Sequence, residues 1–290
     1  MVLQIIINGL LLGGMYAAVG VGFSLVWGVM HVINIAHGAM IMMGAYITYV
    51  VSNALGMNPF LTVPISMVLL FITGYLLQKF IINRVMKTGV FMTLIMAYGL
   101  NILIINIAYI IFKADYRSIP TMFGGAGLEF GGVVVPYGRL IMVLIALVMT
   151  LLLQYFLTHS RTGNAIRAAS LNKNAAQLVG ININNIYAIT FGIGAAMAGA
   201  AGSLMSASFV ITPLFGAPFV GKAFAVACLG GLGTVTGAIV GGLILGLAET
   251  IGAAIFGPSY QQAISFAILV LILIIRPEGI MGKQFFAEAH

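Results

Sequence analysis

The stretch from Gly216 to Phe224 carries the most conspicuous chemical pattern in the chain. It reads GAPFVGKAF, one residue away from the G-x-x-x-x-G-K-[ST] loop that holds nucleotide phosphates. Ala223 stands where that loop needs a hydroxyl for Mg²⁺, and Pro218 lacks an amide that would bind phosphate. The residues that follow are apolar and rich in Gly and Ala. We therefore expect no nucleotide site and no catalytic residues in this chain, which is predicted not to be an enzyme.

Lys222 and Glu249 form a second candidate site. Glu249 is the one carboxylate within the predicted membrane spans. If 219–256 is a hairpin that turns near 235–236, both residues are equally far from the turn and share one depth. Because a lone charge in a membrane is costly, the pattern favours a structural ion pair in the outer half of the membrane. The alternative is that Glu249 takes part in the solute path.

Two polar or Gly-rich interruptions break the apolar runs. HVINIAHGAM, at 31–40, contains Asn34, His37 and Gly38, and LGGLGTVTGAIVGG, at 229–242, contains Gly230, Gly231 and Gly233. Irregular backbone at membrane depth persists only when it is packed in protein or lines a wet cavity. These residues are therefore candidates for broken helices along a translocation path. The alternative is that the glycines let helices pack closely, and that His37 is a packing residue.

The composition indicates that this chain is embedded in a membrane. Hydrophobic residues make up 62% of the 290 residues and charged residues only 6%, against about 25% in soluble domains. The sequence therefore predicts an all-α, polytopic transmembrane helical bundle with broken or re-entrant Gly-rich helices. Residues 1–290 are expected to form a single transmembrane domain. The lone Cys228 and the absence of a His, Cys and acid cluster give no disulfide framework and no metal site. The predicted spans are 4–27, 36–52, 61–78, 89–112, 140–158, 185–206, a longer stretch at 219–256, and 259–275.

Basic residues orient these spans. The positive-inside rule places the clusters around Arg84, Arg167 and Arg276, the last with Lys283, on the cytoplasmic side. Loop 113–139 then lies outside. If 219–256 crosses twice, the count is nine crossings with an external N-terminus.

The loop at 159–182 is longer than a simple connection between two membrane spans needs to be. Its sequence is HSRTGNAIRAASLNKNAAQLVGIN. Ala165, Ala168 and Ala169 give a short helix a small-residue face, and Arg167 and Lys173 give it a charged one. Such a helix at the cytoplasmic mouth suits a groove on a partner protein. The alternative is a basic helix on anionic lipid.

The chain resembles the branched-chain amino acid permease family of ABC importers, in its shorter form of about 290 residues. The resemblance covers nearly the full chain. Its most specific elements are N-x-A-H-G at 34–38 and A-x-L-G-G-x-G at 227–233, supported by 8–46, 161–182 and RPEGIMG at 276–282. The resemblance implies that the loop at 159–182 couples to an ATPase, through Gly163, Asn164, Arg167, Ala168, Asn172, Ala175, Ala176 and Gly180.

The resemblance also implies partners. These are a second homologous permease subunit, two cytoplasmic ATP-binding subunits that hold ATP and Mg, and an extracytoplasmic solute-binding protein. No cofactor is expected in this chain and no nucleic acid partner. The implied location is a bacterial or archaeal inner membrane. The implied solutes are branched-chain amino acids or other amino acids, amides, urea and aromatic acids. A stand-alone secondary transporter or channel is the main alternative, and a membrane scaffold that transports nothing is a second.

Overall fold

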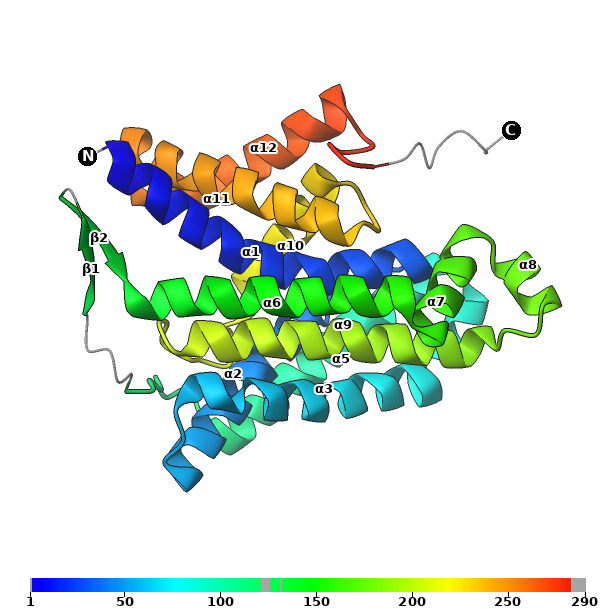
Figure 1. Cartoon of the computed structure of the whole chain (residues 1–290). Coiled ribbons are helices and arrows are strands. Elements are labelled where there is room, and N and C mark those ends of the chain that lie inside the picture. Colours follow the sequence, from blue (N-terminus) through cyan, green and yellow to red (C-terminus); the bar gives the residue numbers. More distant parts are fainter. Residues whose placement is uncertain (1, 121–125, 131, 283–290) are drawn as a thin grey trace.

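The computed structural model describes residues 2–120, 126–130 and 132–282, and the described chain is an elongated bundle of helices (Figure 1). The membrane-scale helices are α1 (Val2–Met30), α2 (His37–Leu55), α3 (Val63–Leu77), α5 (Val90–Phe112), α6 (Tyr137–His159), α9 (Ile183–Ser206), α10 (Ala217–Gly230), α11 (Val235–Phe256) and α12 (Gln261–Ile275). The shorter elements are α4 (Asn83–Val85), α7 (Arg161–Leu171), α8 (Lys173–Leu178), the π-turn η2 (Gln78–Ile82), the 3₁₀ turns η1 (Pro59–Thr62), η3 (Met86–Thr88) and η4 (Pro258–Tyr260), and strands β1 (Gly127–Phe130) and β2 (Val133–Pro136).

Eight helical segments of the described chain are long and apolar enough to cross a membrane. A ninth traverse combines the irregular stretch 207–216 with α10. Helix α10 has 14 residues, or about 21 Å at 1.5 Å per residue, which is less than a hydrocarbon core of about 30 Å. The predicted all-α polytopic fold is confirmed, and 219–256 is indeed a hairpin, with its turn at 231–234.

The two ends of the bundle differ in charge. One end carries the N-terminus and the antiparallel strands β1 and β2, and we call it the hairpin end after this β-hairpin. Hydrogen bonds between the Gln4 side chain and the Val134 backbone attach the start of α1 to β2. The opposite end, here the α7–α8 end, carries most of the described cations: Lys79, Arg84, Lys87, Arg161, Arg167, Lys173 and Arg276. The positive-inside rule predicts that the α7–α8 end faces the cytoplasm. Lys283 and 121–125 of loop 113–139 lie outside the described residues.

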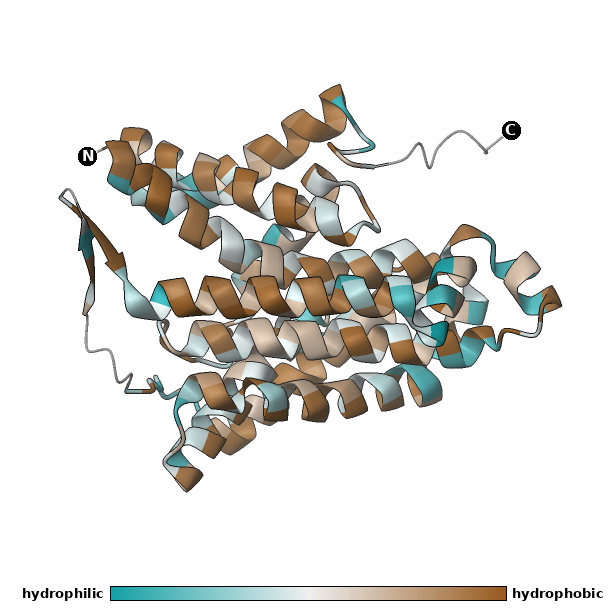
Figure 2. Ribbon diagram, viewed as in Figure 1, coloured by the Kyte–Doolittle hydropathy of each residue, from teal (hydrophilic) through white to brown (hydrophobic). Residues whose placement is uncertain are grey.

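The outer surface of the bundle is apolar along its length. Figure 2 shows hydrophobic residues along the long helices and hydrophilic ones gathered at α7–α8. Side chains such as Ile110 on α5, Leu152 on α6 and Ile274 on α12 point outward and are 81, 62 and 77% exposed. A soluble protein does not expose apolar surface on this scale. The chain is therefore a multi-pass membrane protein.

The same order of elements occurs twice, with opposite direction. Helix α1 is followed by an irregular stretch, 31–36, and by α2, α3 and α5, while α9 is followed by 207–216 and by α10, α11 and α12. Each helix of the second set runs opposite to its counterpart in the first (Figure 1). The main helix pairings follow the same rule, since α1 packs on α11 and α3 packs on α9. This arrangement is an inverted repeat of the kind found in transporters.

Glycines set the distance between the central helices. A Cβ added to Gly242 on α11 would lie 2.7 Å from Ala17 Cα on α1. A Cβ on Gly44 of α2 would lie 2.6 Å from Gly199 Cα on α9. Lipid tails offer no hydrophobic gain for helix association, so close backbone contact supplies the packing energy. The alternative interpretation of the glycines, that they permit close packing, holds for these two interfaces.

We expect Gly242→Val to weaken the α1–α11 contact, because the new side chain meets the backbone of Ala17. The expected loss is about 1–3 kcal/mol, as for overpacked cores. Gly99→Val on α5 is the matched control, because nothing lies within 4 Å of a Cβ there. Thermal unfolding in detergent measures both variants. Equal losses would contradict a specific contact at Gly242.

Candidate functional site

A buried polar cluster joins four helices in the half of the bundle nearer the hairpin end. Glu249 on α11 is fully buried, and its Oε2 lies 3.0 Å from Nζ of Lys222 on α10, whose side chain is 13% exposed. Tyr16 on α1 donates its hydroxyl to the same Oε2 at 2.6 Å, and accepts a hydrogen bond from Lys222. Ser265 on α12 donates to the other oxygen, Oε1. The carboxylate is thus neutralised by one cation and bonded at both oxygens.

The predicted ion pair between Lys222 and Glu249 is confirmed. The α10–α11 hairpin brings the two residues together, although its turn lies at 231–234 instead of near 235–236, so Glu249 is farther along the chain from the turn than Lys222. Tyr16 and Ser265 were not predicted as members of the cluster, because their hydroxyls lie among many apolar residues and no spacing in the sequence marks them. The Lys222 ammonium also lies 4.5 Å from the centre of the Tyr16 ring, a cation–π contact that adds to the pair.

The conformation of the GAPFVGKAF stretch differs from that of a nucleotide-binding loop. From Ala217 onward this stretch is the first turns of α10, with Pro218 in the first turn, where a proline is tolerated. It is therefore helix rather than a phosphate-binding loop, and Lys222 is engaged with Glu249 and Tyr16. Within the described residues there is also no group of three or more His, Cys, Asp and Glu side chains with the geometry of a metal site.

A cavity of about 360 Å³ lies beside Lys222 and is called the hairpin-end cavity here. It lies among α1, α9, α10, α11, α12 and the start of α6. Its lining residues are Asn8, Leu12, Met15, Tyr16, Arg139, Met205, Phe209, Phe219, Lys222, Thr250 and Gln261. The ion pair therefore sits at the inner wall of a partly polar space, on the side that the charge distribution places outside the cell.

Two breaks meet in the interior of the bundle. The stretch 31–36 returns from the end of α1 into the bundle, where α2 begins at His37. The stretch 207–216 enters from the other end, and α10 begins after it. Gly38 and Gly216 touch, since a Cβ on Gly38 would lie 2.7 Å from the Gly216 carbonyl oxygen. The N-termini of α2 and α10 thus adjoin.

His37 is held as part of this junction. Its imidazole is fully buried, donates from Nε2 to the Val19 carbonyl at 2.9 Å, and meets the Phe23 ring edge to face. Asn34 is 3% exposed, and its side-chain oxygen has no partner among the described residues. These contacts fit the packing interpretation of His37, and no described contact gives it a role in solute passage.

The second predicted break lies elsewhere. Gly230, Gly231 and Gly233 form the turn between α10 and α11 at the α7–α8 end, instead of a broken helix inside the bundle. The backbone amides of Ile280 and Met281 donate to the carbonyls of Leu229 and Gly230, which ends α10 with satisfied hydrogen bonds. Gly231 and Gly233 have φ values of 105° and 86°, so the turn needs residues without a Cβ. The true second break, 207–216, carries fewer glycines and was not predicted.

The loop at 159–182 folds as the helices α7 and α8. Ser160 caps α7 by accepting from the Gly163 amide at 2.8 Å, and Asn172 caps α8 by accepting from the Ala175 amide at 2.9 Å. Gly180, with φ of 85°, ends α8. On the face of α7 that points away from the bundle, Arg167 donates to the Asn164 side chain at 2.6 Å. The loop thus contains the predicted short helix, α7, and a second short helix, α8, that begins after Asn172.

The outward face of these helices differs from the prediction. Ala169 and Ala176 are buried and Ala165 and Ala168 are half-buried against the chain's own bundle, so most of the small-residue face points inward. The side chains that project are large and apolar: Leu171, Leu178 and Val179 are 87, 89 and 76% exposed. We call these three the apolar tip. The sequence analysis missed it because it assigned small residues, rather than leucines, to the partner.

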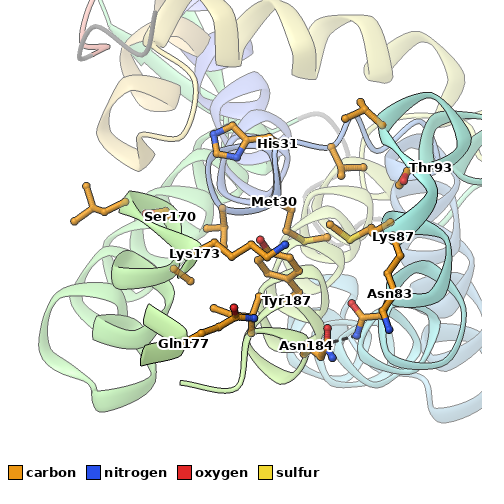
Figure 3. A pocket seen from close by; sticks show the side chains of 17 residues that line it. Met30, His31, Asn83, Lys87, Thr93, Ser170, Lys173, Gln177, Asn184 and Tyr187 are labelled. Atoms are coloured by element: carbon orange, nitrogen blue, oxygen red, sulfur yellow. Dashed lines mark hydrogen bonds between the residues drawn. The ribbon is translucent and has the colours of Figure 1, made fainter. Parts of the chain in front are cut away.

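A second cavity, of about 540 Å³, separates α7 and α8 from the start of α5 (Figure 3). Lys87, Lys173, Gln177 and Tyr187 are among its lining residues, and Asn83 donates to the Asn184 carbonyl at 3.1 Å at its edge. The polar lining accords with the cytoplasmic side, and the space leaves the α7–α8 pair attached through α1, α6 and α9.

Comparisons with known proteins agree along the whole chain. A family model described as the permease component of the branched-chain amino acid transport system matches residues 5–273. The chain is 35% identical to the high-affinity branched-chain amino acid transport system permease protein BraD of Pseudomonas aeruginosa, covering 97% of this chain and 96% of BraD. It is 34% identical to LivH of Escherichia coli K12, described in the same terms, with the same coverage. It is 28% identical to a probable LivH of Methanocaldococcus jannaschii, over 97% of this chain and 93% of that one.

We expect Glu249→Gln and Lys222→Met each to destabilise the folded chain by about 3–5 kcal/mol, because each leaves a buried group without its partner. The double variant should regain part of the loss, because no charge is left unpaired. Thermal unfolding of the purified chain in detergent gives the three values. Losses that simply add would mean that the two residues act separately.

Proposed function

This chain belongs to the branched-chain amino acid permease family, and from that premise we propose that it is the membrane-spanning subunit of an ATP-driven importer for branched-chain amino acids. The observation that carries the proposal is similarity along nearly the full length to BraD and LivH, both described as high-affinity branched-chain amino acid transport permeases. The expected place is the inner membrane. Other amino acids, amides and urea are the other solutes that the sequence leaves open.

The α7–α8 end supports an ATPase partner. The apolar tip projects from the end that carries most of the described cations, beyond the membrane-spanning helices. Exposed leucines at that place favour burial in the groove of a cytoplasmic protein. Two ATP-binding subunits, a second permease subunit and an extracytoplasmic binding protein complete the proposed assembly. ATP and Mg belong to the ATP-binding subunits.

A stand-alone secondary transporter would need a titratable or ion-binding group exposed along its path. Within the described spans, Glu249 is neutralised by Lys222 and His37 is bonded to backbone. Both groups are fully buried. This arrangement favours a transporter that takes its energy from ATP on another chain.

Reconstitution of the complete complex into proteoliposomes tests the proposal. With ATP inside the vesicles next to the ATPase subunits, leucine delivered by the binding protein should accumulate. Vesicles without ATP, or with this chain alone, should accumulate none. Uptake by this chain alone under an ion gradient would favour the secondary transporter, and ATP-driven uptake of urea without leucine would change the solute class.

We expect Leu178→Asp to lower the amount of ATPase that copurifies with the permease by about tenfold, because it places a charge in a desolvated contact. The side chain is 89% exposed, so folding of the isolated chain should be unchanged. Asn174→Asp adds the same charge to an exposed neighbour on α8 and serves as the matched control. Normal copurification with Leu178→Asp, together with weaker binding to anionic vesicles, would favour the lipid-surface role instead.

A further inference from the structure

The hairpin-end cavity has the size and the mixed lining of a small-ligand site. Its volume of about 360 Å³ lies within the range of about 300–1,000 Å³ typical of such sites. Leu12, Met15 and Phe219 are among its apolar lining residues. Its polar lining residues are Asn8, Tyr16, Arg139, Lys222, Thr250 and Gln261.

The polar lining carries a surplus of positive charge. Lys222 and Arg139 both line the cavity, and no described carboxylate does; Glu249 is fully buried and neutralised by Lys222. Arg139 is exposed, and among the described residues no carboxylate pairs with it. One positive charge therefore remains uncompensated in a space with low-dielectric walls, which favours an anionic group.

Unused hydrogen-bonding groups face the same space. An ammonium has three donors, and Lys222 directs two of them to Glu249 and Tyr16, which leaves one for the cavity. The Asn8 carbonyl oxygen accepts from Gln4, so its amide donors remain. The side-chain amide of Gln261 makes no hydrogen bond within the described residues. The cavity thus offers donors for an anion and an amide oxygen for a cation.

We infer that the hairpin-end cavity binds the transported solute as a zwitterionic amino acid with an apolar side chain. Its carboxylate lies between Lys222 and Arg139, its ammonium meets the Gln261 amide oxygen, and its aliphatic side chain packs on Met15 and Phe219. The inference rests on the proposed function, and it assigns the solute to residues that the family resemblance left unassigned.

The test uses protection of a reporter cysteine in the assembled complex in nanodiscs, without the binding protein. Phe209→Cys places a thiol on the cavity wall, at a position that is 38% exposed. A negatively charged methanethiosulfonate reagent modifies it. The wild-type complex gives the background, because Cys228, the only cysteine of this chain, is buried.

Leucine should slow the modification, and so should 4-methylpentanoate, which keeps the carboxylate and lacks the ammonium. Isopentylamine, which lacks the carboxylate, should not. Arg139→Gln should raise the leucine concentration for half-protection by about tenfold, since a charge-assisted hydrogen bond is lost. Lys113→Gln, a matched change of a cation at the same end but outside the cavity, should leave it unchanged.

Equal protection by isopentylamine and leucine, or equal effects of Arg139→Gln and Lys113→Gln, would overturn the carboxylate site. So would the absence of protection by any of these compounds. If the complex still accumulates leucine with ATP in that case, the inferred site is wrong while the proposed function stands. If it accumulates no amino acid at all, the proposed function itself fails.

Discussion

The buried carboxylate of Glu249 is the constraint on which the second half of the bundle depends. A charge withdrawn from water inside an apolar bundle is tolerated only with a cation and hydrogen-bond donors around it. Here those groups come from α1, α10 and α12, while Glu249 itself lies on α11. Four helices therefore have to hold one relative position for the network to close. The same helices form the cavity beside Lys222, so their fixed positions also determine the shape of the cavity, and Lys222 contributes to its positive charge.

Small residues make the arrangement possible. The α1–α11 contact brings Tyr16 and Glu249 together only because Gly242 allows the backbone of Ala17 to come close. The α2–α9 contact likewise depends on close backbone approach, through Gly44 and Gly199, and there Thr48 also donates to Ser203 at 2.6 Å. Both interfaces thus combine close backbone packing with a buried polar contact. The two breaks meet at Gly38 and Gly216, and both of these glycines are buried.

Much of this fold follows from hydropathy and charge. The predicted spans match the observed helices to within a few residues. The pairing of Lys222 with Glu249 was predicted correctly because both lie on one hairpin, but the turn lies at 231–234 instead of 235–236, so the two residues are not equally far from it. The second break was misplaced, because glycines at 230–233 indicate backbone freedom without saying whether it serves a turn or a break. The tail residues Ile280 and Met281 that bond to this turn are distant in sequence, and such a contact leaves no local signal. The apolar tip was missed for a related reason: a leucine on a short amphipathic helix faces inward by default, and only the packed structure shows Leu171 and Leu178 pointing outward.

The central claim is that Glu249 is ionised inside the bundle and neutralised by Lys222. Infrared difference spectroscopy of the wild-type complex against Glu249→Gln, with glutamate labelled by ¹³C to identify its bands, measures this state directly. The account predicts that the Glu249 signal at neutral pH is the antisymmetric stretch of a carboxylate. A signal at the carbonyl stretch of a protonated acid would contradict it, because the pair would then be a neutral hydrogen bond and the cavity would lose the physical basis of its charge.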